Sequence, residues 1–127
     1  MIDGDMRALD RQLLDELSSV VSAAGAAILA ARRRPLETST KADHSPVTAA
    51  DHASEAVILE GLSRALPGIP VVSEEAVADS PPTSLSGSFV LVDPLDGTRE
   101  LIAGRDEFTV NVALFVTTPM TPLTTTL

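Results

Sequence analysis

The sequence predicts an α+β fold in which helices are layered against a sheet. Apolar residues recur every three or four positions over residues 5–34 and 49–66, which is the spacing of one helical face. Short apolar runs, several of them β-branched, follow at residues 69–73, 88–92 and 108–116, and are typical of buried strands. A chain of 127 residues has room for one modest domain of this kind.

The first predicted helix covers about residues 5–34 and ends before Pro35. Its acidic residues lie early and its arginines lie late, as the helix dipole favours. The apolar face consists of Leu9, Leu13, Leu17, Val20, Val21, Ala24 and Ile28. We expect this helix to cover a core or a partner and to carry no chemistry.

A polar, turn-prone connector is expected from Lys41 to Pro46, followed by the second helix at about residues 49–66. Thr48 stands where an N-cap is expected, and Asp51 follows three positions later, as in a capping box. Pro67 and Gly68 end this helix.

The strand-like runs are separated by segments of different character. The run at 69–73 ends in Glu74 and Glu75, and the run at 88–92 ends in Asp93. Residues 76–87 contain Pro81-Pro82 and several serines, and are predicted to form a loop. A third strand is expected at 108–116, where apolar residues alternate with others.

The composition excludes several classes of protein. A formal charge of −9 and a pI near 4.4 argue against a nucleic-acid-binding face, and the chain has no Trp or Tyr for stacking bases. The absence of Cys excludes disulfides and zinc-thiolate sites and suits a reducing cytosol. The longest apolar run, Val20–Ala31, is shorter than the roughly 20 residues of a spanning helix, and its arginines follow it, unlike those of a signal peptide. We therefore expect a cytoplasmic protein without integral membrane contact.

The chemistry is concentrated in the segment VLVDPLDGTRE, residues 90–100. An apolar strand delivers Asp93 at its end, and Asp96 follows after two residues. If the strand ending in Glu74 and Glu75 pairs in parallel with it, four carboxylates meet at one edge of the sheet, where ligands of open α/β sheets commonly bind. Oxygen ligands without nearby His or Cys favour Mg²⁺ or Mn²⁺ over zinc.

The turn after these carboxylates suggests a phosphate site. A helix that begins near Gly97 and Thr98 would offer free N–H groups to an anion, and glycine permits close approach. Cations and amide donors together suit phosphoryl hydrolysis, and the cations would offset the repulsion between an acidic chain and an anionic substrate. The alternative is that Asp96 and Thr98 only form a turn or cap a helix, and that the glutamates are a solvated strand end.

Four motifs in order, KADHSPVTAAD (41–51), VSEE (72–75), DPLDGT (93–98) and EFTVNV (107–112), closely resemble the inositol monophosphatase superfamily. The forms SPVTAAD, SEE and DPLDGTRE are most similar to its 3'(2'),5'-bisphosphate nucleotidase (CysQ-type) branch. The resemblance implies the layered α/β sandwich of the sugar phosphatases, of which this chain would supply the N-terminal helix pair and part of the first sheet.

The resemblance also implies a ligand set. Glu74, Asp93 and Asp96 would bind Mg²⁺ with the backbone carbonyl of Leu95, and Glu75 would assist a further metal through water. Mn²⁺ is an alternative ion, and lithium would inhibit by occupying a Mg²⁺ position. Glu74 would act as a catalytic residue as well as a metal ligand.

The resemblance assigns the remaining roles as follows. Thr98 would orient and help deprotonate the attacking water, with Asp51 hydrogen-bonded to it, which gives Asp51 a functional alternative to capping. The amides of Gly97 and Thr98 would hold the phosphate. Lys41 and Glu75 would lie on the substrate side of the site.

The expected function is Mg²⁺-dependent hydrolysis of a small phosphate monoester, namely 3'-phosphoadenosine 5'-phosphate to AMP and phosphate, in sulfur assimilation. Inositol 1-phosphate and fructose 1,6-bisphosphate are alternative substrates, and a monomer or homodimer is expected. The family's second half carries a Trp-Asp…Ala-Gly motif, whereas this chain has no Trp. We expect residues 1–116 to be the N-terminal part of such a domain and residues 117–127 to be an aberrant, disordered Thr/Pro-rich tail. A third possibility is an inactive fragment that acts only by association.

Overall fold

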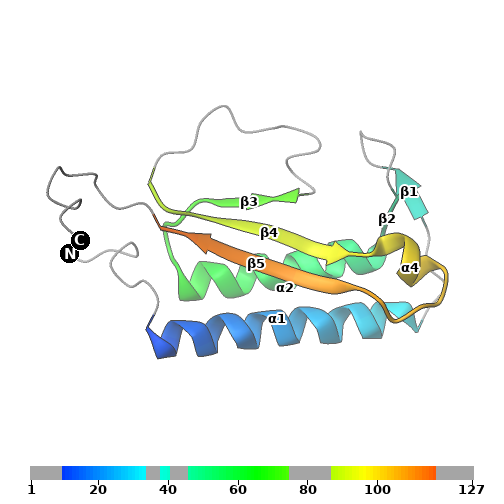
Figure 1. Cartoon of the computed structure of the whole chain (residues 1–127), viewed down its shortest axis with the longest axis horizontal. Coiled ribbons are helices and arrows are strands. Elements are labelled where there is room, and N and C mark those ends of the chain that lie inside the picture. The colour runs from blue at the N-terminus through cyan, green and yellow to red at the C-terminus, as the bar shows by residue number, and fades with distance from the viewer. Residues whose placement is uncertain (1–9, 34–37, 41–45, 75–86, 117–127) are drawn as a thin grey trace, which may run out of the picture.

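The computed structural model describes residues 10–33, 38–40, 46–74 and 87–116. Two long helices run beside each other and cover one face of a three-stranded sheet (Figure 1). In chain order the elements are α1 (Arg11–Arg32), β1 (Thr38–Thr40), β2 (Pro46–Thr48), α2 (Ala49–Ala65), β3 (Val71–Ser73), β4 (Phe89–Asp96), α4 (Thr98–Ile102) and β5 (Thr109–Phe115). The predicted α+β class is confirmed.

The main sheet has the strand order β3-β4-β5. Strand β3 pairs with β4 in parallel, as the sequence predicts, and β5 pairs with β4 antiparallel. A short antiparallel hairpin, β1 with β2, was not predicted, and Pro46 belongs to its second strand rather than to a connector. The predicted tail, and all of the predicted loop except Gly87, lie outside the described residues.

Helix α1 follows the predicted apolar periodicity. It begins after Asp10, whose side chain accepts a hydrogen bond of 2.7 Å from the backbone N–H of Leu13, as expected of an N-cap. Leu13, Ala24 and Ile28 are buried. Predicted residues 5–9, Leu9 among them, lie outside the described part of the chain.

Helix α2 begins with the predicted capping box. The Thr48 hydroxyl accepts from the Ala50 N–H at 3.1 Å, and the Asp51 carboxylate accepts from the Thr48 N–H at 2.8 Å. The two long helices approach closely at Gly61, where an added Cβ would lie 2.5 Å from a methyl carbon of Val20. A larger residue at this position would require the Val20 side chain or one of the helices to shift.

The two faces of the main sheet have opposite surroundings. Val90 and Val92 are fully buried and face the helices, in line with the alternation expected of a strand. On the other face, Leu91 is 42% exposed and Phe115 is 46% exposed, and the Phe115 ring stacks on Phe89 with 4.8 Å between centroids. The described residues therefore leave an apolar sheet face accessible to solvent, so the strands are buried on one face only, whereas the sequence predicted strands buried throughout.

Helix α1 is long and apolar enough to cross a membrane by length and composition, with a mean hydropathy of 1.5 over its most apolar window. The prediction of no spanning segment rests on the 12-residue run Val20–Ala31, whereas the helix is 22 residues long. Mostly buried core helices of soluble proteins pass the same test; α1 packs against α2 and β5, with 22% of that window buried.

Candidate functional site

The ends of β3 and β4 bring acidic residues to one edge of the sheet. Ser73 pairs with Val92 in the parallel register, so the next residues, Glu74 and Asp93, follow on adjacent strands at the same edge. Glu74 is exposed, whereas Asp93 is half-buried and its Oδ1 atom is buried. The parallel pairing of β3 with β4, on which the predicted approach of the carboxylates depends, is therefore present.

Strand β4 does not end at Asp93, as the sequence predicted, but continues to Asp96. Asp93 pairs with Asn111 and Asp96 with Thr109, so β4 advances three positions where β5 advances two. This extra residue is a β-bulge, and Pro94 is tolerated there because it has no N–H to offer a ladder. The bulge buries the segment between the two aspartates and leaves Asp96 exposed.

A tight turn at Gly97 follows the bulge. Gly97 has φ of 109°, and an added Cβ would lie 2.7 Å from the carbonyl oxygen of Glu107. Both features require glycine. Helix α4 then begins at Thr98, where the sequence predicted a helical turn, and the Leu101 N–H donates to the Gly97 carbonyl at 3.0 Å.

The structure brings Thr98 and Asp51 together, although 47 positions separate them in the chain. The Thr98 hydroxyl donates to Oδ2 of Asp51 at 2.8 Å, and Oδ1 of Asp51 accepts from both the N–H and the hydroxyl of Thr48, each at 2.8 Å. Asp51 has no exposed surface. The two interpretations of Asp51, helix cap and partner of Thr98, therefore describe contacts of the same carboxylate.

Two residues on α2 that sequence reasoning missed also contact this edge. The buried Ser54 hydroxyl donates to the carbonyl oxygen of Pro94 at 2.7 Å, inside the bulge. The carboxylate of Glu55 accepts a hydrogen bond from the hydroxyl of Ser73 at the end of β3. The available signal was their spacing, because positions three and four after Asp51 share its helical face.

The remaining predicted positions are placed as follows. Leu95 is buried in the bulge, and its carbonyl lies 3.5 Å from the Thr98 hydroxyl. Lys41 and Glu75 lie outside the described residues. Across ranges 10–33, 38–40, 46–74 and 87–116, no three Asp, Glu or His side chains gather closely enough to form a metal cluster.

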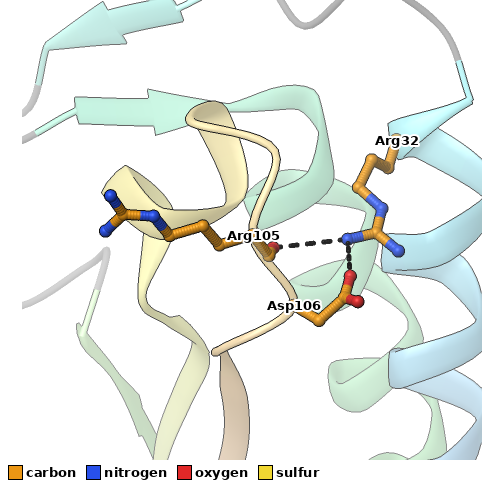
Figure 2. A network of polar contacts seen from close by, with 3 residues as sticks. All are labelled: Arg32, Arg105 and Asp106. Carbon is orange, nitrogen blue, oxygen red and sulfur yellow. Dashed lines mark hydrogen bonds and ion pairs between the residues drawn. The ribbon is translucent and has the colours of Figure 1, made fainter.

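A polar network ties the end of α1 to the segment that follows α4. Figure 2 shows one nitrogen of the Arg32 guanidinium, Nη1, donating to both the Asp106 carboxylate, at 2.6 Å, and the carbonyl oxygen of Arg105, at 3.4 Å. The guanidinium also lies over the Phe108 ring, 5.9 Å from its centroid. Phe108 also adjoins the Gly97 turn, so this residue lies between that turn and the end of α1.

The fold and these motifs define a known family. The chain matches the inositol monophosphatase family over residues 10–122, and it belongs to that family. The resemblance inferred from the four motifs is thereby confirmed.

Relatives within the family carry a more specific name. The 3'(2'),5'-bisphosphate nucleotidase CysQ of Shigella flexneri is 44% identical over 104 residues, and that of Salmonella typhimurium is 46% identical over 107 residues. Each match covers 80% of this chain and 42% of the relative. The chain therefore spans less than half the length of the curated relatives it matches.

Solved structures give the same result for the fold. The extragenic suppressor protein suhB from Bartonella henselae superposes with a TM-score of 0.70 at 25% identity, covering 83% of this chain and 41% of that one. CysQ from Bacteroides thetaiotaomicron, a bacterial member of the inositol monophosphatase family, gives a TM-score of 0.60 at 31% identity, with 86% and 39% coverage. The sandwich fold implied by the resemblance is confirmed for the part of the fold that the chain spans.

Proposed function

We propose that this chain carries part of the active site of a Mg²⁺-dependent phosphatase that hydrolyses 3'-phosphoadenosine 5'-phosphate to AMP and phosphate. The contact between Thr98 and Asp51, 2.8 Å long and beside the strand-end carboxylates, is the observation that carries the proposal. The sequence identity of 44% and 46% with bisphosphate nucleotidases named CysQ supports the choice of substrate. Inositol 1-phosphate and fructose 1,6-bisphosphate remain the alternative substrates.

The chemical type of the proposed donor atoms suits a hard divalent cation. Carboxylates of Glu74, Asp93 and Asp96 and the carbonyl of Leu95 would hold Mg²⁺, or Mn²⁺ in its place, and every donor is oxygen. Mg²⁺ is commonly held by one or two carboxylates and completes its shell with water and phosphate, so a three-carboxylate cluster is not required. When bound, the ion would supply charge neutralisation and a more acidic water.

The protein's own groups would position and deprotonate the water. The Thr98 hydroxyl donates its hydrogen bond to Asp51. The lone pairs of the hydroxyl oxygen therefore remain free to accept a hydrogen bond from water. As the water oxygen bonds to phosphorus and the ester oxygen leaves, the water's proton passes to Thr98 Oγ1 while Asp51 takes up the threonine proton. Solvent protonates the leaving alkoxide.

The rest of the assignment concerns the substrate. The amides of Gly97 and Thr98 would bind the phosphate, with Lys41 and Glu75 on the substrate side. We propose a cytoplasmic monomer or homodimer that acts on a small phosphorylated metabolite of sulfur assimilation, without nucleic-acid polymers as partners. The packing of α1 against α2 favours a core helix over an integral membrane segment.

The test is phosphate release by the 127-residue chain with Mg²⁺ and each of the three substrates. We expect 3'-phosphoadenosine 5'-phosphate to be the best substrate, with turnover suppressed by lithium and lost in Asp93→Asn. Asp15→Asn is the control, because it makes the same charge change at an exposed position on α1. Equal turnover in Asp93→Asn and the unsubstituted chain would refute the site assignment.

A second candidate function is association without catalysis. It is favoured by the solvent-exposed apolar face of the sheet, where Leu91 and Phe115 are accessible, and by β5, the last strand of the described sheet. A chain that binds no cation and releases no phosphate, yet forms a stable complex in sedimentation experiments, would favour this candidate over the phosphatase.

A further inference from the structure

Three polar residues on one face of α2 point to three separate parts of the candidate site. Asp51, Ser54 and Glu55 occupy positions i, i+3 and i+4, so their side chains share one helical face. Their partners are the Thr98 hydroxyl, the Pro94 carbonyl and the Ser73 hydroxyl. Figure 1 shows α2 alongside the sheet, where one straight helix can reach all three segments.

Ser54 holds the bulge of β4 from the inside. Its side chain has no exposed surface, and its hydroxyl donates to the Pro94 carbonyl over 2.7 Å. A buried carbonyl in a bulge lies outside the regular ladder and needs a donor. By fixing the plane of the peptide between Pro94 and Leu95, this hydrogen bond constrains Asp93 on one side and the Leu95 carbonyl on the other.

Glu55 holds the end of β3 in the same way. Its carboxylate accepts a hydrogen bond from Ser73, and Glu74 is the next residue along the chain. Ser73 is itself buried and pairs with Val92, one position before Asp93. Adjacent residues of one helix therefore contact both parallel strand ends.

We propose that Ser54 and Glu55 are positioning residues that set the spacing between Glu74 on β3 and Asp93 on β4. This inference rests on the proposed function, because the spacing matters only if both carboxylates bind the cation. Groups that orient metal ligands typically change metal affinity by about 10- to 100-fold when removed. Neither residue is expected to touch the cation or the substrate.

The test is the affinity of the 127-residue chain for Mn²⁺, measured by electron paramagnetic resonance of the free ion. Ser54→Ala and Glu55→Ala are each expected to weaken binding about 10-fold or more. Ser63→Ala is the matched control, because Ser63 lies on the same helix but is exposed and donates to the Glu60 carbonyl. Glu55→Gln keeps an oxygen that can accept from Ser73, and should bind within about threefold of the unsubstituted chain.

Circular dichroism without cation confirms that each variant is folded at the assay temperature. Glu55 is half-buried, so Glu55→Ala tests the proposal even if Ser54→Ala, at a fully buried site, fails to fold. If both alanine variants bind Mn²⁺ like Ser63→Ala while Asp93→Asn loses binding, the positioning roles are wrong and the ligand assignment stands. If the unsubstituted chain binds no Mn²⁺, or Asp93→Asn binds it equally well, the ligand assignment fails and this inference fails with it.

Discussion

Gly97→Ala is the substitution whose cost the structure defines most closely. The φ of 109° lies in a region that residues with a Cβ rarely adopt, and such strain costs about 1–3 kcal/mol. The new Cβ would also lie 2.7 Å from the Glu107 carbonyl and 3.1 Å from the Phe108 Cα, and overpacking of this kind costs about 1–3 kcal/mol. We expect the free energy of unfolding to fall by about 2–6 kcal/mol, whereas folded domains have a total of about 5–15 kcal/mol.

Gly104→Ala separates the two contributions. Gly104 also has a positive φ, 84°, but nothing lies within 4 Å of an added Cβ. This variant should lose only the strain contribution of about 1–3 kcal/mol. Urea unfolding followed by far-ultraviolet circular dichroism measures both variants, since the chain has no Trp or Tyr to report by fluorescence. Equal destabilisation of the two variants would refute the argument that the Glu107 backbone excludes a side chain at Gly97.

Three further predictions can be checked in the same urea assay. Thr98→Val leaves a buried oxygen of Asp51 without its donor and should cost about 1–3 kcal/mol, whereas Thr98→Ser should restore most of the loss. Leu13→Ala should lower the free energy of unfolding by about 2–5 kcal/mol, because Leu13 is fully buried. Leu14 is 54% exposed, so Leu14→Ala should change this free energy by no more than about 0.5 kcal/mol. Equal effects would contradict the assigned helix face. Arg32→Ala removes a surface ion pair and should cost about 1 kcal/mol or less; a larger loss that salt does not reduce would contradict this.

The helices were predictable because their signals are local. The apolar period of α1 and the Thr48–Asp51 capping box depend on residues within a few turns of each other, and both are confirmed. The β1–β2 hairpin escaped prediction because strands of three residues are too short to show a period. The bulge escaped because the pairing of Asp96 with Thr109 depends on a separate strand.

The contacts within the candidate site were predictable only in part, and the roles of its residues stay a prediction. Glu74 and Asp93 follow apolar runs that end in acid, and the parallel register places these two at one edge, whereas the predicted meeting of four carboxylates is not seen among the described residues. The local pattern predicted a capping role for Asp51 and the family resemblance implied a second role beside Thr98, and only the fold brings Thr98 to the second oxygen of Asp51. Ser54 carried only the weak signal of its spacing from Asp51, because its partner is a backbone carbonyl 40 positions away and leaves no side-chain signature.

The central claim is that the ends of β3 and β4 bind a divalent cation. A crystal of the chain soaked in Mn²⁺, with diffraction recorded at the manganese absorption edge, tests this claim most directly. The account predicts an anomalous peak at the sheet edge, within about 2.0–2.4 Å of carboxylate oxygens of Asp93 and Glu74, the range seen for hard cations. A crystal with saturating Mn²⁺ and no peak beside Asp93, or with its strongest peak elsewhere on the molecule, would contradict it.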